Sequence, residues 1–339
     1  MNRAVTVALA ILVVLALAAY RWTDHYLYAP LRLQQPVIVT VAAGSSFAAV
    51  AQDLAAKGVL KYPRILIGYA RLRGQASKIR AGEYEIPRVS TPVSLIEQLV
   101  RGEVLLREVT IVEGWTVRDM LAALARNPYL AHTLEGIPLA QLMARLGEPV
   151  KHPEGQFFPD TYRFARATSD LEILRKAHEA LRARLDAAWN ARAATVPFSD
   201  PYSALILASM VEKESALPSE RERIAGVFVR RLRMGMRLQS DPTVIYGLGE
   251  TYTGDIRSRD LHADTPYNTY TRAGLPPTPI ALPGEGSLQA ATHPEDSGAL
   301  FFVATGEPDG SHYFSATLAE HDAAVRRYLA RTRNRSATP

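Results

Sequence analysis

Two glutamates at the end of the most apolar internal segment are the residues best suited to chemistry in this chain of 339 residues. Residues 204–211 contain Ser209 as their only polar member, and Glu212-Lys213-Glu214-Ser215 follows directly. A helix that is apolar on all sides is a buried one, so these carboxyl groups emerge from a buried helix. Burial without a partner raises the pKa of a carboxyl group. A general acid that cleaves an ether-like bond needs such a shift towards neutrality.

The two glutamates of this motif lie on different faces of the predicted helix. Glu214 continues an apolar stripe at i−7, i−4 and i−3, which is formed by Leu207, Met210 and Val211. Glu212 follows a smaller and more polar face, which is formed by Leu205, Ala208 and Ser209. We therefore predict that Glu214 is the desolvated acid. On its local sequence alone, the motif also fits a solvated Glu-Lys-Glu cluster at a helix end, with no catalytic role.

The helices that must position this motif have clear start and stop signals. Ser199-Asp200-Pro201 predicts the start of the carboxylate helix, and Pro218 breaks the chain after it. Ser219 and Glu222 form a capping box for the next helix, which Gly235 ends. Its last turn carries three arginines whose charge suits the helix dipole, namely Arg230, Arg231 and Arg233.

Two loops after these helices are suited to binding sugars. Residues 235–247, and residues 265–270 together with 274–280, are punctuated by glycine and proline, and they hold Tyr, Asn, Gln or Asp side chains. Flat apolar faces combined with amide and carboxylate hydrogen bonds suit a saccharide. Each such residue by itself is more often a turn or packing element, so the indication lies in their density.

The composition excludes several classes of protein. The chain is 47% apolar and 22% charged, with a formal charge of +5 and no cysteine. Its length allows two folded domains, each with its own core. Without cysteine there is no disulfide framework, thiolate zinc site or cysteine nucleophile. The basic residues are spread along the chain, so the charge does not indicate a nucleic-acid partner.

The N-terminus predicts a membrane anchor. The segment from Ala4 to Tyr20 has Thr6 as its only polar residue before the aromatic end, and Trp22 follows. As a helix it covers roughly 26 Å, close to the thickness of a bilayer core. Arg3 favours a cytoplasmic N-terminus, which places the rest of the chain outside the cytoplasm. A cleaved signal peptide, with Ala16-Leu17-Ala18 at its cleavage site, and a buried soluble helix are the alternatives.

The predicted fold class is α+β, with an N-terminal transmembrane helix, a small α+β domain and a larger, mainly helical domain with short strands. The small domain has strands at 37–41 and 81–87, which enclose two helices, and a third helix begins at Thr91. This order resembles the LysM-like module of cell-wall proteins, and a spacer domain without ligand is the alternative. The predicted boundaries are 1–36 for cytoplasmic tip, anchor and stalk, 37–106 for the LysM-like domain, 107–334 for the catalytic domain and 335–339 for a tail.

Four motifs carry a resemblance to a known family. They are Glu212-Lys213-Glu214-Ser215, Ser219-Glu220-Arg221, the segment 235–247 and Tyr267-Asn268-Thr269-Tyr270. With them the chain closely resembles the endolytic murein transglycosylases of the MltG or YceG-like family, over almost its whole length. The resemblance implies a bacterial inner-membrane enzyme that cuts peptidoglycan strands internally and leaves 1,6-anhydro-N-acetylmuramyl ends. One departure is Ser240, where many relatives carry threonine; this change conserves the hydroxyl group.

The resemblance also implies roles for individual residues. Glu214 matches the catalytic acid of the family, in agreement with the stripe argument, and it would act first as acid and then as base. Candidates for substrate binding are Glu212, Glu220, Gln239, Asp241, Tyr246, Asn268 and Tyr270. No metal or cofactor is expected, since the sequence has no His-x-x-x-His pair, no Gly-x-Gly-x-x-Gly and no Walker motif.

Two other functions remain open at this point. The chain could be a membrane-anchored, wall-binding scaffold for cell-wall synthases, or a two-carboxylate muramidase that pairs Glu214 with Glu212, Glu220 or Asp241. The expected partners are peptidoglycan strands and inner-membrane lipid, with synthases of the penicillin-binding type as protein partners.

Overall fold

The computed structural model describes residues 3–215 and 217–336 and combines helices with three two-stranded sheets among them. The chain divides into two compact units. The first comprises the chain up to Arg107 together with Arg163–Ala167, and the second comprises Glu108–Tyr162 and the chain from Thr168 onward. The predicted mixture of helix and strand behind an apolar N-terminal helix is confirmed. The predicted tail, 335–339, lies mostly outside the described residues.

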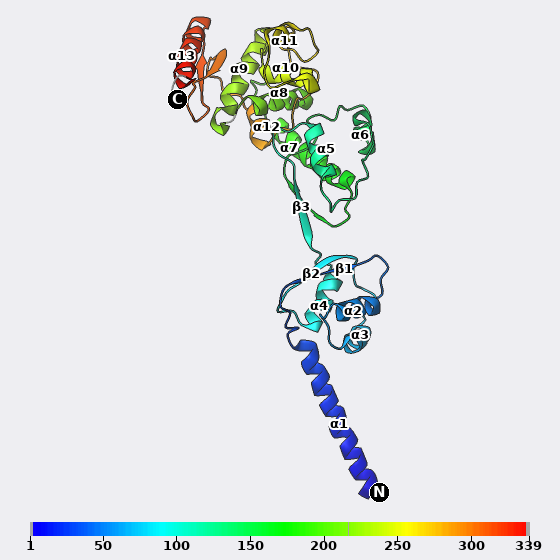
Figure 1. Cartoon of the computed structure of the whole chain (residues 1–339). Coiled ribbons are helices and arrows are strands. Elements are labelled where there is room, and N and C mark those ends of the chain that lie inside the picture. The colour runs from blue at the N-terminus through cyan, green and yellow to red at the C-terminus, as the bar shows by residue number, and fades with distance from the viewer. Residues whose placement is uncertain (1–2, 216, 337–339) are drawn as a thin grey trace. The chain divides into compact units, whose positions relative to one another are not determined.

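The first unit has the predicted order of strand, helix, helix, strand and helix (Figure 1). Its elements after the N-terminal helix are β1 (Val37–Val41), α2 (Phe47–Ala56), α3 (Pro63–Leu72), β2 (Gly82–Ile86) and α4 (Pro92–Arg101). β1 and β2 pair antiparallel, with Val39 opposite Tyr84. Ser46 caps α2, and a capping box at Thr91 begins α4, as the sequence predicts. The label LysM-like for this unit stays a prediction.

The N-terminal helix α1 (Arg3–Tyr28) is long and apolar enough to cross a membrane. Only its final turns contact the rest of the first unit: Leu27 is buried in the core of this unit, and α1 packs against α4. The structure therefore differs from the stalk predicted within residues 1–36, because α1 continues as a helix to Tyr28 and its end packs against the first unit.

β3 (Leu106–Thr110) and β4 (Thr161–Ala165) pair with each other, and the boundary between the two units falls within both strands. The single boundary predicted between residues 106 and 107 therefore omits the segment Arg163–Ala167, which belongs to the first unit.

The second unit is built around α8 (Pro201–Glu214). Residues 204–211 are all buried, because α8 is packed by α7 (Asp170–Asn190), α9 (Arg221–Arg233), α10 (Asp241–Leu248) and α12 (Glu285–Thr292). The other elements of this unit are α5 (Val117–Ala125), α6 (Leu139–Arg145), the short helix η1 (Pro218–Glu220), η2 (Gly249–Thr251) and α11 (Ser258–His262).

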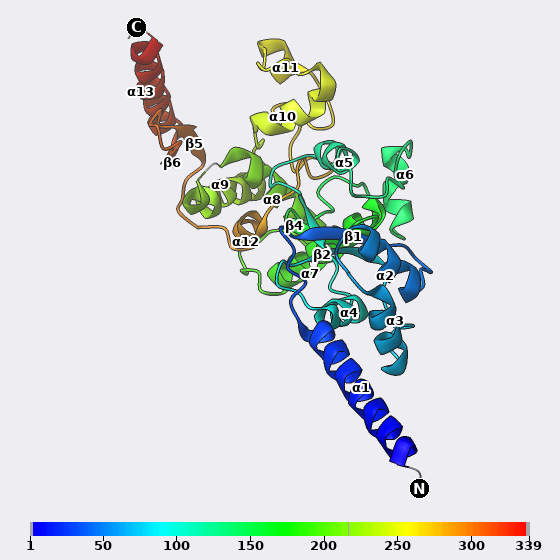
Figure 2. The same cartoon turned by 60° about the horizontal axis from the view of Figure 1, so that its bottom comes forward.

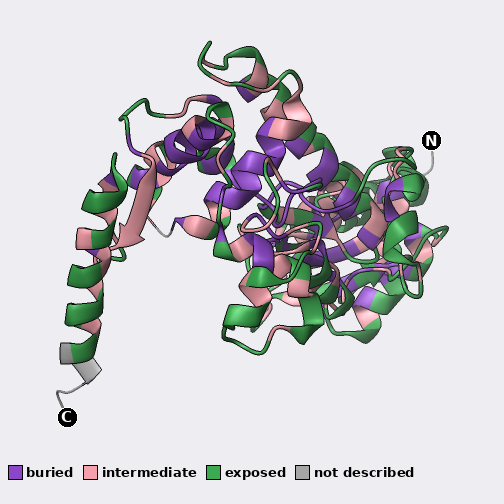
Figure 3. Cartoon of the chain, turned by 90° about the horizontal axis from the view of Figure 1, so that it is seen from above, coloured by how far each residue is buried: buried purple, intermediate pink, exposed green. Residues whose placement is uncertain are grey.

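The C-terminal part of the second unit is a hairpin followed by a helix. β5 (Phe301–Ala304) pairs antiparallel with β6 (His312–Ser315), and α13 (Leu318–Ser336) packs against both strands (Figure 2). In Figure 3 this helix is largely exposed or half-buried, in contrast to the buried helices at the centre of the unit. The hairpin and the start of α13 contribute one wall of the site described next.

Candidate active site

The position of Glu214 depends on where α8 begins and where it ends. Asp200 caps the first turn by accepting hydrogen bonds from the Ser203 backbone N–H at 2.9 Å and from its hydroxyl at 2.8 Å. At the other end the backbone of Ser215 is extended, so the helix stops at Glu214. The last helical residue is thus held at the end of a buried helix, as the apolar stripe predicts.

A cavity of about 390 Å³ surrounds Glu214, a size typical of a small-molecule site. The pKa of Glu214 is raised from the ordinary 4.5 to about 7, mainly by burial and in smaller part by the nearby charge of Asp241. A hydrogen bond of 2.5 Å from the Ser240 hydroxyl and the charge of Arg231 act in the opposite direction. The lining consists of Glu214, Arg231, Leu238, Gln239, Asp241, Tyr270, Phe301, Phe302, Leu318 and His321.

The loop that carries Ser240 is fixed by Thr269. The backbone N–H of Gln239 donates to the Thr269 carbonyl at 3.1 Å, and that of Ser240 donates to the Thr269 hydroxyl at 2.9 Å. Gln239 has a φ of 51°, a left-handed conformation that non-glycine residues seldom adopt. These contacts keep Gln239 in this conformation on the cavity wall and direct the Ser240 hydroxyl at Glu214.

Asp241 and Tyr270 form a second polar group in the cavity. The Tyr270 hydroxyl donates to Asp241 Oδ1 at 2.6 Å. Burial raises the pKa of Tyr270, and the neighbouring carboxylate raises it further, so the phenol keeps its proton. Glu214, Gln239, Asp241 and Tyr270 are thus the four predicted site residues that the structure brings together.

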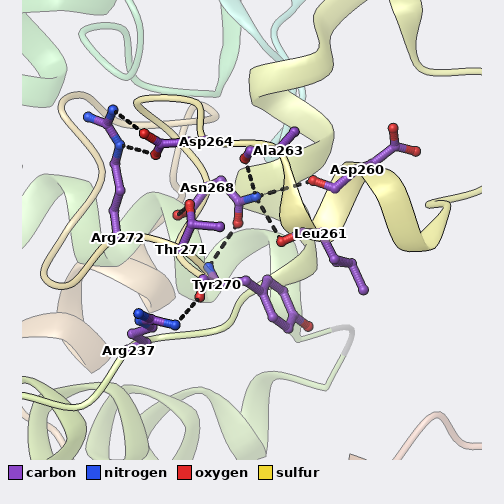
Figure 4. A network of polar contacts seen from close by, with 9 residues as sticks. All are labelled: Arg237, Asp260, Leu261, Ala263, Asp264, Asn268, Tyr270, Thr271 and Arg272. Atoms are coloured by element: carbon purple, nitrogen blue, oxygen red, sulfur yellow. Dashed lines mark hydrogen bonds and ion pairs between the residues drawn. The ribbon is translucent and has the colours of Figure 1, made fainter.

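Asn268, a predicted sugar-binding residue, has its amide fully engaged within the protein (Figure 4). Its side-chain nitrogen donates to the carbonyls of Asp260, Leu261 and Ala263, and its oxygen accepts from the Tyr270 backbone N–H at 2.9 Å. The residue is only 1% exposed. Asn268 therefore connects α11 to the loop that carries Tyr270, and its own amide does not line the cavity.

Glu212 is also engaged by protein groups. One of its oxygens accepts from the Gly284 backbone N–H at 2.9 Å, and the other lies 3.3 Å from Arg221 Nη2. Its side chain is 5% exposed. The different face that the sequence assigns to Glu212 corresponds to an ion pair away from the cavity lining.

Glu220 and Tyr246 complete the set of predicted site residues that lie outside the cavity lining. Glu220 accepts from the His312 backbone N–H at 2.9 Å, and its other oxygen lies 2.7 Å from His312 Nδ1, so it joins η1 to β6. The Tyr246 hydroxyl donates to Glu154 Oε2 at 3.0 Å. Burial raises the pKa of Glu154 to about 7.

Sequence reasoning missed half of the cavity wall. Arg231, which the sequence assigns to the helix dipole, is instead a buried residue of the lining. Its Nε and Nη1 donate to the carbonyls of Leu300 and Leu238, both at 2.7 Å. The remaining wall comes from β5 and α13, and none of the candidates predicted from the sequence lies in these two elements.

The chain matches the model of the YceG-like family over residues 39–327. It belongs to this family. The chain is similar to the endolytic murein transglycosylase of Bacillus subtilis, with 31% identity over 310 residues that cover 86% of this chain and 85% of the relative. It is 26% identical to the protein of the same name from Streptococcus pneumoniae serotype 2, covering 86% of this chain but 58% of that relative. The resemblance inferred from the four motifs is therefore confirmed.

A solved structure supports the same assignment. A protein from Listeria monocytogenes described as YceG-like, with a crystal structure at 2.6 Å, is 29% identical to this chain with a TM-score of 0.55. The match covers 86% of this chain and 99% of that protein.

Proposed function

We propose that this protein is a membrane-anchored endolytic enzyme that cleaves the β-1,4 bond between MurNAc and GlcNAc within peptidoglycan strands and leaves 1,6-anhydroMurNAc ends. That it is a lytic transglycosylase is established by its family and by relatives named endolytic murein transglycosylases. The observation that carries the finer proposal is the position of Glu214, whose pKa is about 7, in a cavity of suitable size.

Glu214 supplies both proton transfers of the proposed reaction. As an acid it protonates the glycosidic oxygen, and the bond from that oxygen to C1 of the muramyl residue breaks. As a base it then takes the proton of the C6 hydroxyl while the C6 oxygen bonds to C1. A pKa near 7 suits both steps, because a group that gives and regains a proton works best near the ambient pH. No water is consumed, and Glu214 ends in its starting form.

The residues around Glu214 have supporting roles in this proposal. The Ser240 hydroxyl holds one oxygen of Glu214, so the other oxygen is free to face the substrate. Asp241 carries negative charge in the same cavity, which favours an oxocarbenium-like transition state. Gln239 and Tyr270 add hydrogen-bonding groups along the wall.

A hydrolase is the alternative chemistry, and Asp241 is the residue that could support it. Glycoside hydrolysis uses a second carboxylate as nucleophile or to activate water. In the structure Asp241 Oδ1 accepts from Tyr270, whereas Glu212 and Glu220 are engaged elsewhere. Of the three partners considered for a muramidase, Asp241 alone lies in the cavity lining.

Digestion of purified murein in ¹⁸O-labelled water decides between the two reactions. We expect ends without label and with the mass of 1,6-anhydroMurNAc, formed from the interior of long strands. Substantial ¹⁸O at the new muramyl C1 would mean that water is the nucleophile, and the lytic mechanism would then be wrong.

We further propose that α1 is an uncleaved, single-pass anchor in the cytoplasmic membrane, with the N-terminus in the cytoplasm. The length and composition of α1 support a span, and Arg3 favours this orientation. The enzyme would then act at the membrane surface, ending or trimming nascent strands beside synthases of the penicillin-binding type. Recovery of a mature chain that begins at Ala19 would show a cleaved signal peptide instead.

A second function, glycan binding by the first unit, is favoured by a cavity in that unit. The cavity measures about 480 Å³ and is lined by the start of α2, by α3 and by the segments that precede α2 and β2, with residues such as Ser46, Arg71 and Ser77. Zymography separates the two functions: a binding protein without activity leaves murein intact, and an enzyme clears it. Co-sedimentation of the full-length Glu214→Gln protein with murein measures the binding alone.

A further inference from the structure

The residues at the start of α13 have no part in the reaction described above. Glu320 Oε2 accepts from the backbone N–H groups of Ala316 and Thr317, at 3.1 and 3.2 Å. In return, the Glu320 backbone N–H donates to the Thr317 hydroxyl at 3.3 Å. This reciprocal arrangement is a capping box, and it fixes where α13 begins. The next residue, His321, is therefore held in the first turn of the helix.

His321 faces the same cavity as Glu214. Its ring stacks on Phe301, with centroids 5.1 Å apart and an angle of 22° between the planes. Nδ1 of His321 is buried and has no hydrogen-bond partner among the described residues. Burial lowers the pKa of His321, and the charge of Arg231 lowers it further, so the ring is neutral at pH 7.

The enclosed Nδ1 determines what the ring offers to the cavity. A neutral imidazole has one N–H donor and one acceptor nitrogen. Buried N–H groups without an acceptor are rare in proteins, which places the proton of His321 on Nε2. The accessible edge of the ring then presents an N–H donor to the cavity.

Arg231 adds a second donor next to the same Phe301 ring. Its guanidinium carbon lies 5.2 Å from the Phe301 ring centroid, and its Nε and Nη1 are held by backbone carbonyls. Nη2 has no hydrogen-bond partner within the described ranges, and Arg231 lines the cavity. Two hydrogen-bond donors therefore lie next to the Phe301 ring, the neutral imidazole of His321 and the cationic guanidinium of Arg231. Protein contacts hold both in place.

We infer that His321 and Arg231 form a substrate-binding subsite that holds a carbonyl oxygen on a substituent of the sugar ring. This inference rests on the proposed function. A carbonyl oxygen has two lone pairs and can accept from both donors at once, and a positive charge beside it strengthens the hydrogen bonds. Two substituents of a peptidoglycan strand carry such an oxygen, the acetamido group of each sugar and the lactyl group of the muramyl residue.

The test uses the full-length, detergent-solubilised protein with His321→Phe. Phenylalanine keeps the ring stacked on Phe301 and removes the donor. We expect KM for murein strands to rise about tenfold, the effect of one hydrogen bond to an uncharged group, with kcat changed less than threefold and Tm unchanged. His321→Gln, whose amide restores a donor, should return KM to within about threefold of the wild type. His262→Phe, an exposed position on α11, is the matched control.

Direct binding identifies the substituent and keeps the inference separate from the proposed function. The probe is the N-acetylglucosamine tetramer, which has acetamido but no lactyl groups, measured against Glu214→Gln with and without His321→Phe. Weaker binding of both tetramer and murein strands supports an acetamido contact, and weaker binding of murein strands alone supports a lactyl contact. Unchanged affinity for both would overturn the subsite. If the wild type fails to cleave murein while tetramer binding still depends on His321, the proposed function fails and the subsite stands.

Discussion

Replacing Glu214 by glutamine removes a proton and a negative charge and leaves the shape of the side chain almost unchanged. The amide oxygen can still accept the hydrogen bond from Ser240, which measures 2.5 Å in the native protein. The substitution therefore separates the acid–base chemistry of Glu214 from its packing. We expect it to raise stability at alkaline pH and to abolish activity.

The magnitude follows from the pKa of Glu214, which burial raises from 4.5 in the unfolded chain to about 7 in the folded protein. Between these values the folded state binds the proton and the unfolded state does not, so the stability of the native protein falls as pH rises through this window. The difference of about 2.5 in pKa corresponds to about 3 kcal/mol once pH exceeds 7. Glutamine does not ionise, so the variant does not lose this stability as the pH rises.

Urea unfolding of the full-length protein at pH 5 and pH 8.5 tests this reasoning. Glu214→Gln should match the wild type within about 1 kcal/mol at pH 5 and exceed its stability by about 3 kcal/mol at pH 8.5. Comparing the two proteins at each pH cancels the contribution of Glu154, whose pKa is also about 7. A variant that is no more stable than the wild type at pH 8.5 would refute the desolvation of Glu214.

Activity provides the second half of the same prediction. General acid–base groups contribute about 10²- to 10⁴-fold in rate, and Glu214→Gln should lose that factor on murein. The activity of the wild type should fall as pH rises above about 7, because the proton-donating form of Glu214 is lost. Substantial activity in the glutamine variant would exclude Glu214 as the acid.

Three further outcomes are expected. Glu212→Gln should cost far less activity than Glu214→Gln. It should lower stability by about 2 kcal/mol, the worth of a hydrogen bond to a charged group, because it removes the charge that pairs with Arg221. Circular dichroism melts and murein digestion measure the two effects. Glu154→Gln should flatten the fall in stability between pH 5 and pH 8.5, and an unchanged slope in urea titrations would contradict the buried carboxyl group. A reporter that is active only in the cytoplasm should be inactive when fused after Pro339, and activity there would reverse the orientation of α1.

The sequence predicted the central helix and the desolvation of Glu214 because both depend on local patterns. Asp200 and Pro201 set the start of α8, and the apolar run fixed its burial without knowledge of its neighbours. The i−7, i−4 and i−3 stripe separated Glu214 from Glu212, and the structure places the two carboxyl groups in different surroundings. Periodicity within one helix was enough for this distinction.

The polar candidates outside the cavity could not be sorted from sequence, because their partners are distant along the chain. Tyr246 donates to Glu154, and Glu220 pairs with His312, each across 92 positions. An amide or phenol in a polar loop looks the same whether it faces a sugar or a backbone carbonyl. Asn268 illustrates this, since its three carbonyl partners depend on how α11 folds back beside it.

The pKa of Glu214 depends on the C-terminal segment as well as on α8. Phe301, Phe302 and Leu318 line the cavity around Glu214, and apolar walls that exclude water are what raise the pKa of a carboxyl group. The pairing of Glu220 with His312 fixes the hairpin to η1, only a few residues after Glu214 in the chain. The segment that follows Glu214 and the hairpin that carries Phe301 and Phe302 are therefore joined by a direct contact. A substitution that frees the hairpin would return the pKa of Glu214 towards 4.5 without touching the carboxyl group itself.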